Sequence, residues 1–519
     1  MKEEYSVDVA VVGFGGSGMT AALSAAEKGA SVMVLEKAGR IGGTSAVTGG
    51  PMAVNPPSQV QREILDWNDP TIGKKRTKKA GEQLVDADAL YQDWINYTKV
   101  DGVQYGKEPI ISETIRKSGA MLDWLSGYGF EFGDAAGFIG NKWAIYTVYK
   151  GNKSLTESFF DKMLNTYTAK LGGKYLLETE ATELLFADGK ITGVKARKQD
   201  GTEVVVRAAS VILATGGFGG SDAVMEKYLG ESWKLYGMAQ NDGAGIRMAT
   251  QIGAATYNID MPPMSHFSAP PVIFTQFDTA FDNDIPYGMI NTSETLAVNK
   301  SGNRFVNEMD IGYGAYVGGS RFYSIYSKDQ IDILREKGFA FISTGRYLNR
   351  GGIKADTPIK NIDSVMDAGI KAGIVFKAGS LSKLAEAIGA RNGKKMTSDA
   401  LLSAVASYNE GVKTGNDALK KKVDRFSRLG AIGENSEYYL AVTGAPYIYS
   451  TCGGLDVDAD MRVLNAKGEA IGGLYAVGTD SMGVLFTNKK GYANYGGVAQ
   501  GYCFVSGRIA GERAAATGK

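Results

Sequence analysis

The chain has 519 residues, of which 44% are hydrophobic and 22% are charged, and its formal net charge is +1. The length predicts about two or three domains, the composition is that of a globular protein, and the balanced charge gives no reason to expect nucleic acid or an anionic membrane as a partner. Two cysteines and one histidine exclude a disulfide scaffold, a cysteine-ligated iron–sulfur cluster, a c-type haem and a multi-histidine metal site.

The N-terminal stretch MKEEYSVDVAVV starts with acidic residues and continues into a glycine-rich segment, which is unlike a signal peptide. No apolar run reaches the roughly 18 residues that a membrane-spanning helix needs. We therefore expect a cytoplasmic, soluble protein without a membrane span.

The first predicted elements are a strand, a glycine turn and a helix. Residues 7–12, VDVAVV, form a continuous apolar run that is typical of a buried parallel strand. Gly13, Gly15 and Gly18 follow as G-x-G-x-x-G, and the alanine-rich segment 19–29 predicts a helix that ends at a glycine. In such a turn the first glycines let backbone N–H groups meet a pyrophosphate at the helix N-terminus.

The second predicted strand, SVMVLE (31–36), ends at Glu36. A carboxylate at this place can accept a hydrogen bond from a ribose hydroxyl, and it disfavours the 2′-phosphate of NADP. The strand, turn, helix and acid together predict dinucleotide binding. The structural alternative is a glycine-rich turn that serves only packing.

The next segment, AGRIGGTSAVTGG (38–50), is one that an NAD enzyme does not need after its second strand. It resembles the glycine- and hydroxyl-rich segment of FAD proteins that runs along the pyrophosphate and under the isoalloxazine. Thr44 and Ser45 would supply hydroxyls there. No histidine lies nearby, which excludes a histidyl-linked flavin.

Further stretches of the same kind extend over nearly the whole chain. They are ETEATELLFADGKITGVKAR (178–197), SVILATGGFGG (210–220), NDGAGIRMATQIGAA (241–255), TCGGL (451–455), GGLYAVGTDSMG (472–483) and FVSGRIAGERAA (504–515). Together with the N-terminal motifs, this set resembles the flavoprotein family of soluble fumarate reductases and succinate dehydrogenase flavoprotein subunits, which also includes 3-ketosteroid dehydrogenases.

The resemblance implies an α/β fold and FAD as the cofactor, and the lack of a nearby histidine predicts that FAD is bound without a covalent link. A Rossmann-like FAD-binding domain would be built from both chain ends, 1–265 and 435–519, with an inserted α+β capping domain, 266–434, that holds the substrate. The residues expected to bind FAD are Gly13, Gly15, Gly16, Ser17, Gly18, Glu36, Lys37, Gly43, Thr44, Ser45, Gly49, Gly50, Ala181, Thr215, Gly216, Asp242, Gly478, Asp480, Gly497 and Val498.

The chain departs from the family at the positions that bind a dicarboxylate. Fumarate reductases hold the two carboxylates with arginines, which form charge-assisted, bidentate hydrogen bonds. In RFVNEMDIGYGAY (304–316) the matching position is about Gly312, and in ANYGG the other is Asn494. A pocket without these cations suits a neutral, flat or polycyclic substrate with a carbonyl or a phenol.

The stretch GYANYGGVAQGY (491–502) contains Tyr492 and Gly496, which resemble the tyrosine hydroxyl and glycine N–H that hold the substrate ketone in 3-ketosteroid dehydrogenases. Such donors stabilise an enolate. Tyr313 resembles the tyrosine of the capping domain that moves a proton there, and His266 lies near a family histidine. The structural alternative is that the tyrosines pack in the core and His266 is a loop residue. Cys503 lies in an apolar helix and is expected to be core.

We therefore predict an FAD-dependent oxidoreductase that transfers hydride between flavin N5 and a carbon of a neutral, polycyclic carbonyl or phenolic substrate. It would be a ketosteroid-type dehydrogenase or an ene-reductase of steroids or polyphenols. One alternative is a fumarate-reductase-type reductase of a small unsaturated acid, and another is a flavin electron-carrier subunit. The expected partners are the small-molecule substrate and an electron donor or acceptor that the sequence does not identify.

Overall fold

The computed structural model describes residues 2–138, 141–150, 157–271, 284–341, 354–493 and 495–517. The chain forms two compact units. The first unit contains Met1–Gly230, Gly237–Met264 and Ser450–Lys519, and the second contains Glu231–Tyr236 and Ser265–Tyr449. The domain boundaries inferred from the sequence, at 266 and 434, stay a prediction.

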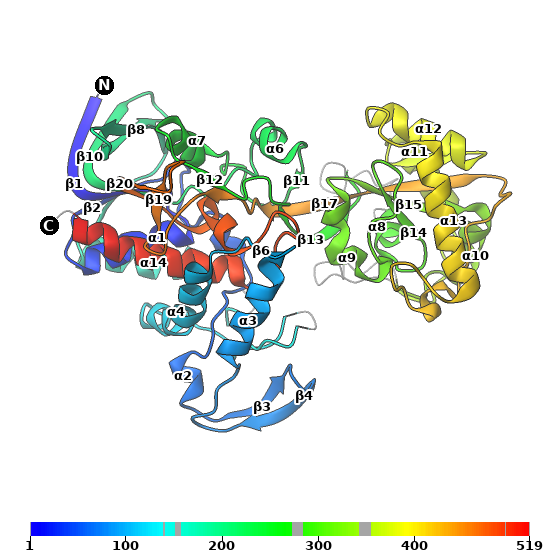
Figure 1. Cartoon of the computed structure of the whole chain (residues 1–519), viewed down its shortest axis with the longest axis horizontal. Helices are drawn as coiled ribbons and strands as arrows, with labels where there is room; N and C mark the ends of the chain where they lie inside the picture. The colour runs from blue at the N-terminus through cyan, green and yellow to red at the C-terminus, as the bar shows by residue number, and fades with distance from the viewer. Residues whose placement is uncertain are drawn as a thin grey trace. The chain divides into compact units, whose positions relative to one another are not determined.

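The first unit is built on an eight-stranded sheet with the order β19-β20-β9-β10-β1-β2-β7, in which β8 pairs with β9 (Figure 1). Its central pairings, of β1 with β2 and β10 and of β10 with β20, are parallel. Val9, Ala10 and Val11 of β1 have no exposed surface, as the apolar run VDVAVV predicts. The strands are β1 (Lys2–Val12), β2 (Val32–Leu35), β7 (Lys174–Leu176), β8 (Thr179–Ala187), β9 (Lys190–Lys198), β10 (Glu203–Leu213), β19 (Arg462–Leu464) and β20 (Ala470–Ala476).

Two helices from distant parts of the chain, α1 (Gly16–Glu27) and α14 (Val498–Thr517), pack against each other. Gly507 and Gly511 allow this close approach. A Cβ atom at Gly507 would lie 2.3 Å from the Ser17 carbonyl oxygen, and one at Gly511 would lie 2.2 Å from that of Ala21. The glycines of the C-terminal helix are therefore required by helix packing.

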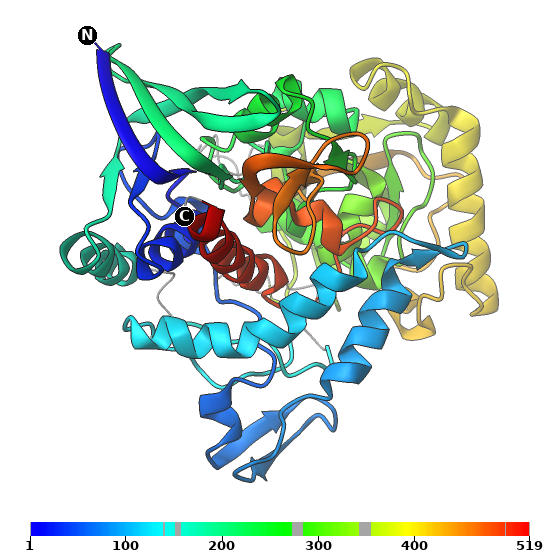
Figure 2. The ribbon, with the colours of Figure 1, turned by 60° about the vertical axis from the view of Figure 1, so that its left-hand side comes forward.

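The remaining elements of the first unit lie outside the main sheet. In both ribbon views the β3–β4 hairpin projects beyond the helices α3 and α4 (Figure 2). These elements are α2 (Pro57–Val60), β3 (Ile64–Asp69), β4 (Lys74–Lys78), α3 (Ala87–Thr98), β5 (Lys99–Val100), β6 (Val103–Gln104), α4 (Glu108–Gly127), α5 (Glu157–Asn165), α6 (Asp222–Leu229), α7 (Ala244–Gln251), β12 (Thr256–Tyr257) and β18 (Gly454–Leu455).

The second unit contains a six-stranded sheet with the order β11-β17-β15-β14, in which β13 and β16 also pair with β17. Strand β17 follows residue 434, the predicted end of the capping domain, and belongs to this sheet. The strands are β11 (Lys234–Leu235), β13 (Met264–Ala269), β14 (Leu296–Asn299), β15 (Phe322–Ser327), β16 (Val375–Ala378) and β17 (Tyr439–Ser450).

Helices cover both faces of this second sheet. Along β15, Phe322 and Tyr326 pack into one apolar cluster with α10 and α11, whereas Tyr323 and Ile325 pack into another with α12 and α13. The helices are α8 (Asp284–Asn291), α9 (Ile311–Gly314), α10 (Lys328–Lys337), α11 (Ile362–Lys371), α12 (Leu381–Arg391) and α13 (Ser398–Thr414). The α/β fold class predicted from the sequence is confirmed.

Within the described residues, none of the helices combines the length and the apolar character that crossing a membrane would require.

Candidate cofactor and active site

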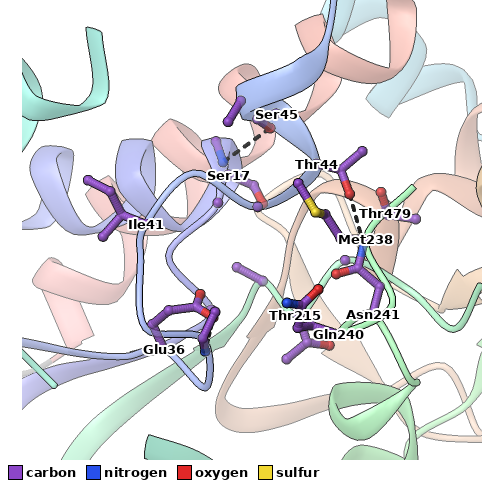
Figure 3. A pocket seen from close by; sticks show the side chains of 18 of the residues that line it. Ser17, Glu36, Ile41, Thr44, Ser45, Thr215, Met238, Gln240, Asn241 and Thr479 are labelled. Carbon is purple, nitrogen blue, oxygen red and sulfur yellow. Dashed lines mark hydrogen bonds between the residues drawn. The ribbon is translucent and has the colours of Figure 1, made fainter. Parts of the chain in front are cut away.

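A cavity of about 640 Å³ lies within the first unit, at the carboxyl ends of β1, β2 and β10 (Figure 3). Ligands of parallel α/β sheets bind at this edge. The predicted FAD residues that line the cavity are Gly13, Gly15, Gly16, Ser17, Glu36, Lys37, Gly43, Thr44, Ser45, Ala181, Thr215, Gly216 and Asp242.

The glycine turn leaves the N-terminus of α1 open toward the cavity. Gly13 has φ +99°, and a Cβ atom on it would lie 2.3 Å from the Ala214 carbonyl oxygen; one on Gly18 would lie 1.9 Å from the carbonyl oxygen of Gly13. These two glycines pack the turn itself. The first turn of α1 has no acidic residue, and Gly15, its N-cap, makes no side-chain capping bond. Such a helix end is suited to an anion such as a pyrophosphate.

Glu36 lies at the end of β2, as predicted, and both of its carboxylate oxygens accept backbone hydrogen bonds. The N–H of Phe14 donates to Oε2 at 2.7 Å, and that of Ala38 donates to Oε1 at 2.8 Å. Burial raises the pKa of Glu36, and the two backbone donors oppose this effect. Each oxygen keeps a second lone pair, so the carboxylate can hold the turn and also accept from a ligand hydroxyl.

Two hydroxyl residues lie on the short 3₁₀ helix η1 (Gly43–Val47), at the side of the cavity. The N–H of Gly16 donates to Ser45 Oγ at 3.2 Å, and Asn241 Nδ2 donates to Thr44 Oγ1 at 3.1 Å (Figure 3). The segment 38–50 is thus held against α1 and against the loop that follows β11.

Three charged residues of the cavity lining pair with each other. Lys37 Nζ lies 2.7 Å from Asp242 Oδ2 and 4.0 Å from Glu180 Oε1, and all three residues line the cavity.

Asp480 lies behind the cavity wall and does not line it. This fully buried carboxylate accepts from the N–H of Thr215 at 2.6 Å and from that of Gly217 at 2.8 Å. Burial raises its pKa. In this position Asp480 orients Thr215 and Gly216, which do line the cavity; a direct contact with FAD stays a prediction.

Other predicted FAD residues are absent from the lining, namely Gly18, Gly49, Gly50, Gly478, Gly497 and Val498. Close packing explains some of these glycines. A Cβ atom on Gly50 would lie 1.8 Å from the Thr147 carbonyl oxygen, and one on Gly497 would lie 2.5 Å from the Pro51 carbonyl carbon.

Tyr492 is buried just before α14, and its hydroxyl accepts from the N–H of Ala499 at 3.2 Å. Its ring packs at a tilt against Phe486, with centroids 4.8 Å apart. Burial raises the pKa of Tyr492 well above its usual range, so the phenol stays protonated at neutral pH. Ala499 lines the cavity, which puts the Tyr492 hydroxyl next to its wall.

Gly496 has φ +95°, and a Cβ atom on it would lie 2.5 Å from Cβ of Phe138. The other two tyrosines of this stretch pack internally. Tyr495 lies against Trp94, with centroids 5.1 Å apart, and the Tyr502 hydroxyl lies 3.0 Å from Ser481 Oγ. The catalytic roles of Tyr492 and Gly496 stay predictions.

The remaining predicted catalytic residues belong to the second unit. His266 lies in β13 and Tyr313 in α9, but their side chains are outside the described part of the structure. Gly312, predicted to stand at about the position of the first dicarboxylate-binding arginine, is buried in α9, whereas Asn494 is not among the described residues.

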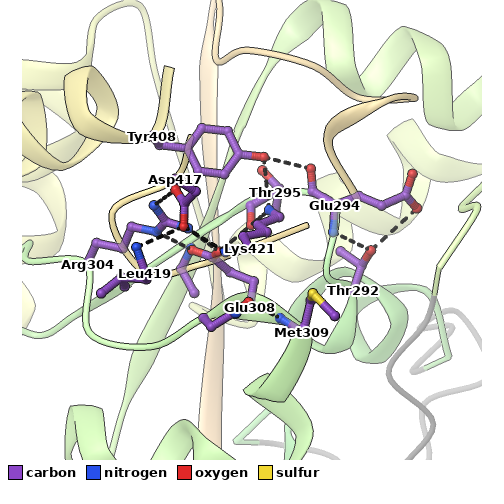
Figure 4. Close-up of polar contacts among 12 residues, drawn as sticks. Thr292, Glu294, Thr295, Arg304, Glu308, Met309, Tyr408, Asp417, Leu419 and Lys421 are labelled. Carbon is purple, nitrogen blue, oxygen red and sulfur yellow. Dashed lines mark hydrogen bonds and ion pairs between the residues drawn. The ribbon is translucent and has the colours of Figure 1, made fainter. Parts of the chain in front are cut away.

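A buried ionic cluster holds the segment that leads to α9 (Figure 4). Arg304 donates to both carboxylate oxygens of Glu308, at 2.8 and 2.7 Å, and also pairs with Asp417. Lys421 Nζ lies 3.5 Å from Glu308 Oε2 and donates to the Tyr408 hydroxyl at 3.2 Å. The sequence analysis missed this cluster, because its members come from segments that are distant in the sequence.

The sequence analysis also missed part of the cavity wall. The additional polar and sulfur-containing residues that line it include Thr48, Asp161, Met238, Gln240, Asn241, Ser450, Thr479, Gln500 and Cys503. The prediction that Cys503 is a core residue was wrong. It lies one turn after Gln500 on α14, so the two residues share the face that borders the cavity.

These observations fit FAD. The volume is typical of a small-molecule site, the open end of α1 suits the pyrophosphate, and Gln500 presents a buried Nε2 without a hydrogen-bond partner among the described residues. The glycine turn would hold the pyrophosphate and Glu36 the adenosine ribose.

The chain belongs to the FAD binding domain family, whose model matches residues 8–493. It is 29% identical to an NADH:acrylate oxidoreductase of Vibrio harveyi, over 98% of this chain and 50% of that protein. It is 28% identical to a vinyl phenol reductase of Lactiplantibacillus plantarum, over 98% of this chain and 96% of that protein. The chain thus spans half of the first relative and nearly all of the second.

A solved structure with the same fold is the 3-ketosteroid Δ1-dehydrogenase of Sterolibacterium denitrificans in complex with 1,4-androstadiene-3,17-dione. The TM-score is 0.63 at 19% identity, covering 98% of this chain and 99% of that one. Fumarate reductases and a 3-oxosteroid 1-dehydrogenase are further relatives. The resemblance inferred from the motifs is confirmed, and the chain is an FAD-dependent oxidoreductase of this family.

Proposed function

We propose that the protein reduces a carbon–carbon double bond conjugated with a phenol or a carbonyl in a neutral, flat substrate. The observation that carries the proposal is that Gly312 and Asn494 stand at about the positions where the motifs predict the dicarboxylate-binding arginines of fumarate reductases. Without those cations, no charge-assisted hydrogen bond offsets the free-energy cost of burying a carboxylate.

Two relatives support this substrate class, and one of them also supports this direction. The vinyl phenol reductase is similar over nearly the full length of both chains, and its name states a neutral phenolic substrate. The 3-oxosteroid 1-dehydrogenase acts, by its name, on a neutral polycyclic ketone in the opposite direction. With either substrate the oxygen carries negative charge after hydride transfer, as an enolate from the ketone or as a phenolate from the phenol, so both substrates need a hydrogen-bond donor at that oxygen.

Tyr492 is the proposed donor. Reduced FAD, when bound, would supply the hydride. With a conjugated ketone, hydride at the β carbon passes negative charge to the ketone oxygen, and the α carbon takes up a proton. With a vinylphenol bound as its phenolate, the terminal carbon takes up a proton first to give a quinone methide, and hydride at the benzylic carbon then returns the charge to the oxygen. In both cases a phenol O–H at that oxygen would stabilise the charge. The bond that Tyr492 accepts from Ala499 N–H polarises its hydroxyl and makes it a stronger donor. The N–H of Gly496 would be the second donor.

Tyr313 is the proposed proton donor, and His266 is the alternative. Either residue would have to reach the substrate carbon directly or through one water molecule. The FAD would be held without a covalent bond. The partner that supplies electrons stays unidentified.

A small unsaturated acid is the second candidate substrate, because the NADH:acrylate oxidoreductase is 29% identical. An electron-carrier subunit is the third possibility. Anaerobic stopped-flow spectroscopy of the reduced protein separates the three. We expect 4-vinylphenol or a 3-ketosteroid enone to reoxidise the flavin at least about a hundredfold faster than fumarate or acrylate. Equal rates with fumarate would contradict the proposal, and no response to any substrate would favour the electron carrier.

A further inference from the structure

Gln500 is a buried polar residue of the cofactor cavity whose hydrogen-bonding capacity is only partly used. It is the third residue of α14, lines the cavity and is only 5% exposed. Its Nε2 has no hydrogen-bond partner among the described residues. A buried amide that lacks a partner is costly, so such a group at the wall of a ligand cavity indicates an atom of the ligand.

Thr48 holds one end of this carboxamide. The hydroxyl of Thr48 lies 3.2 Å from Gln500 Oε1 and 3.1 Å from the carbonyl oxygen of Ser45. A glutamine at the third position of a helix often reaches back to cap the helix, but here its side chain bonds to a segment 452 residues earlier. In this orientation the carboxamide presents Nε2, a donor, to the cavity; turned over, it would present Oε1, an acceptor, which would need a donor from the ligand.

The unpaired end lies at the N-terminus of α1. A Cβ atom on Gly16 would be 3.0 Å from Gln500 Nε2 and 2.5 Å from Ser45 Oγ, so both side chains meet over this glycine. The Gly16 N–H donates to Ser45 Oγ, which leaves the Ser45 O–H and Gln500 Nε2 as donors at this place. A ligand group rich in acceptor oxygens satisfies both of them.

We propose that Gln500 donates a hydrogen bond from Nε2 to an oxygen of the phosphate–ribityl part of FAD, and that Thr48 positions the amide. The proposal rests on FAD binding and is independent of which substrate the enzyme reduces. It assigns a cofactor-binding role to a side chain of the C-terminal helix that no glycine or hydroxyl motif marks.

The test uses Gln500→Met in the full-length chain, since methionine has a similar length but no N–H. The FAD dissociation constant is measured by ultrafiltration with flavin fluorescence, and Tm is measured with and without FAD. We expect the dissociation constant to rise by about tenfold to a hundredfold, as for the loss of one bond to a charged or strongly polar oxygen. The Tm of the FAD-free protein should not fall.

The matched control is Gln240→Met, which makes the same chemical change in an exposed glutamine of the same cavity. Its FAD affinity should change less than about threefold, because water replaces an exposed partner. Thr48→Val should weaken FAD binding less than Gln500→Met does. The double variant should lose less FAD-binding free energy than the two single variants lose together, because both changes act on one hydrogen bond.

Two results would overturn the proposal. One is an unchanged FAD dissociation constant in Gln500→Met together with an equal fall of Tm in the FAD-free and FAD-bound forms, which would mean that Gln500 only packs. The other is wild-type affinity in Gln500→Glu, which has nearly the same shape but presents an anion to the phosphate. This second variant decides the question if Gln500→Met does not fold.

Discussion

Tyr492 combines two possible tasks in one hydroxyl group. Its oxygen accepts from the Ala499 N–H and so satisfies part of the N-terminus of α14. Its position beside the cavity wall also suits the proposed contact with the substrate oxygen. Removing the hydroxyl affects the two tasks differently, because capping contributes to stability and substrate binding contributes to rate.

Tyr492→Phe keeps the ring against Phe486 and removes only the hydroxyl. We expect kcat to fall by about 10²–10³, the usual effect of losing one donor to a developing oxyanion. Stability should fall by about 1 kcal/mol, because one N–H at the end of α14 loses its acceptor. Steady-state kinetics and thermal unfolding measure the two effects.

The control for this variant is Tyr502→Phe. The Tyr502 hydroxyl pairs with Ser481 in the core and does not line the cavity, so this change should alter Tm but leave kcat within a few-fold. If both variants lose activity equally, or if Tyr492→Phe changes only Tm, the assignment of Tyr492 to the substrate is wrong.

The residues of the site were predictable where their positions follow from local sequence. Gly13, Gly15 and Glu36 follow from one strand–turn–helix–strand pattern. The positions of Asn241 and Gln500 at the site do not follow from such a local pattern. Their contacts with Thr44 and Thr48 join residues that are 197 and 452 positions apart. No local pattern distinguishes an amide that reaches a distant cavity from one that is solvated on a helix.

At the scale of elements, the loop after β10 depends on a side chain from the other end of the chain. Asp480 accepts two buried backbone hydrogen bonds from this loop, whose residues Thr215 and Gly216 line the cavity. An alanine at position 480 would leave both N–H groups unsatisfied, at about 1–3 kcal/mol each.

We therefore expect Asp480→Ala to be destabilised by about 2–5 kcal/mol and to be purified with less FAD than the wild type. Asp480→Asn keeps one acceptor oxygen and should therefore lose less stability and less FAD than Asp480→Ala. Chemical denaturation and the ratio of absorbance at 450 and 280 nm measure stability and FAD content. A normal FAD content in a destabilised Asp480→Ala would show that the loop keeps its shape without the carboxylate.

The ionic cluster of the second unit predicts a pH dependence of stability. Burial lowers the pKa of Lys421 to about 8, whereas an unfolded lysine titrates at about 10.4. Between these two values the unfolded chain binds more protons than the folded chain, so this group makes stability rise with pH, by at most about 1.4 kcal/mol per pH unit.

Urea unfolding at pH 7.5 and pH 9.5 tests this expectation. The free energy of unfolding of Lys421→Met should not rise between pH 7.5 and pH 9.5. The control Lys422→Met removes the exposed lysine next to Lys421 and should keep the rise seen in the wild type. A parallel pH dependence in the wild type and Lys421→Met would mean that Lys421 keeps its charge throughout the range.

At the scale of the whole molecule, the fold and cofactor class followed from motifs that recur along the chain, because several of them mark strands of one sheet and others mark the helices α1, α7 and α14. The domain boundaries stay a prediction. Strand β17 lies after the predicted end of the insert and nevertheless pairs with β15 and β16 of the second unit. An apolar run does not show which sheet a strand joins.

The purified protein should be yellow and should release FAD, rather than FMN, on denaturation. Glu36 lies where the adenosine ribose is expected, and FMN has no such ribose. Chromatography of the supernatant after heat precipitation checks this expectation. Colour retained in the precipitate would indicate a covalent bond, and FMN alone would contradict the role of Glu36.

The glycine-lined contact between α1 and α14 also has a consequence for biosynthesis. Residues 28–497 must be translated after α1 before its partner helix exists, which takes about 25–95 s at 5–20 residues per second. During that time the surface of α1 and the strands beside it has no permanent cover. The nascent chain is therefore expected to depend on ribosome-associated chaperones, and FAD is expected to bind only after release, when α14 completes the cavity.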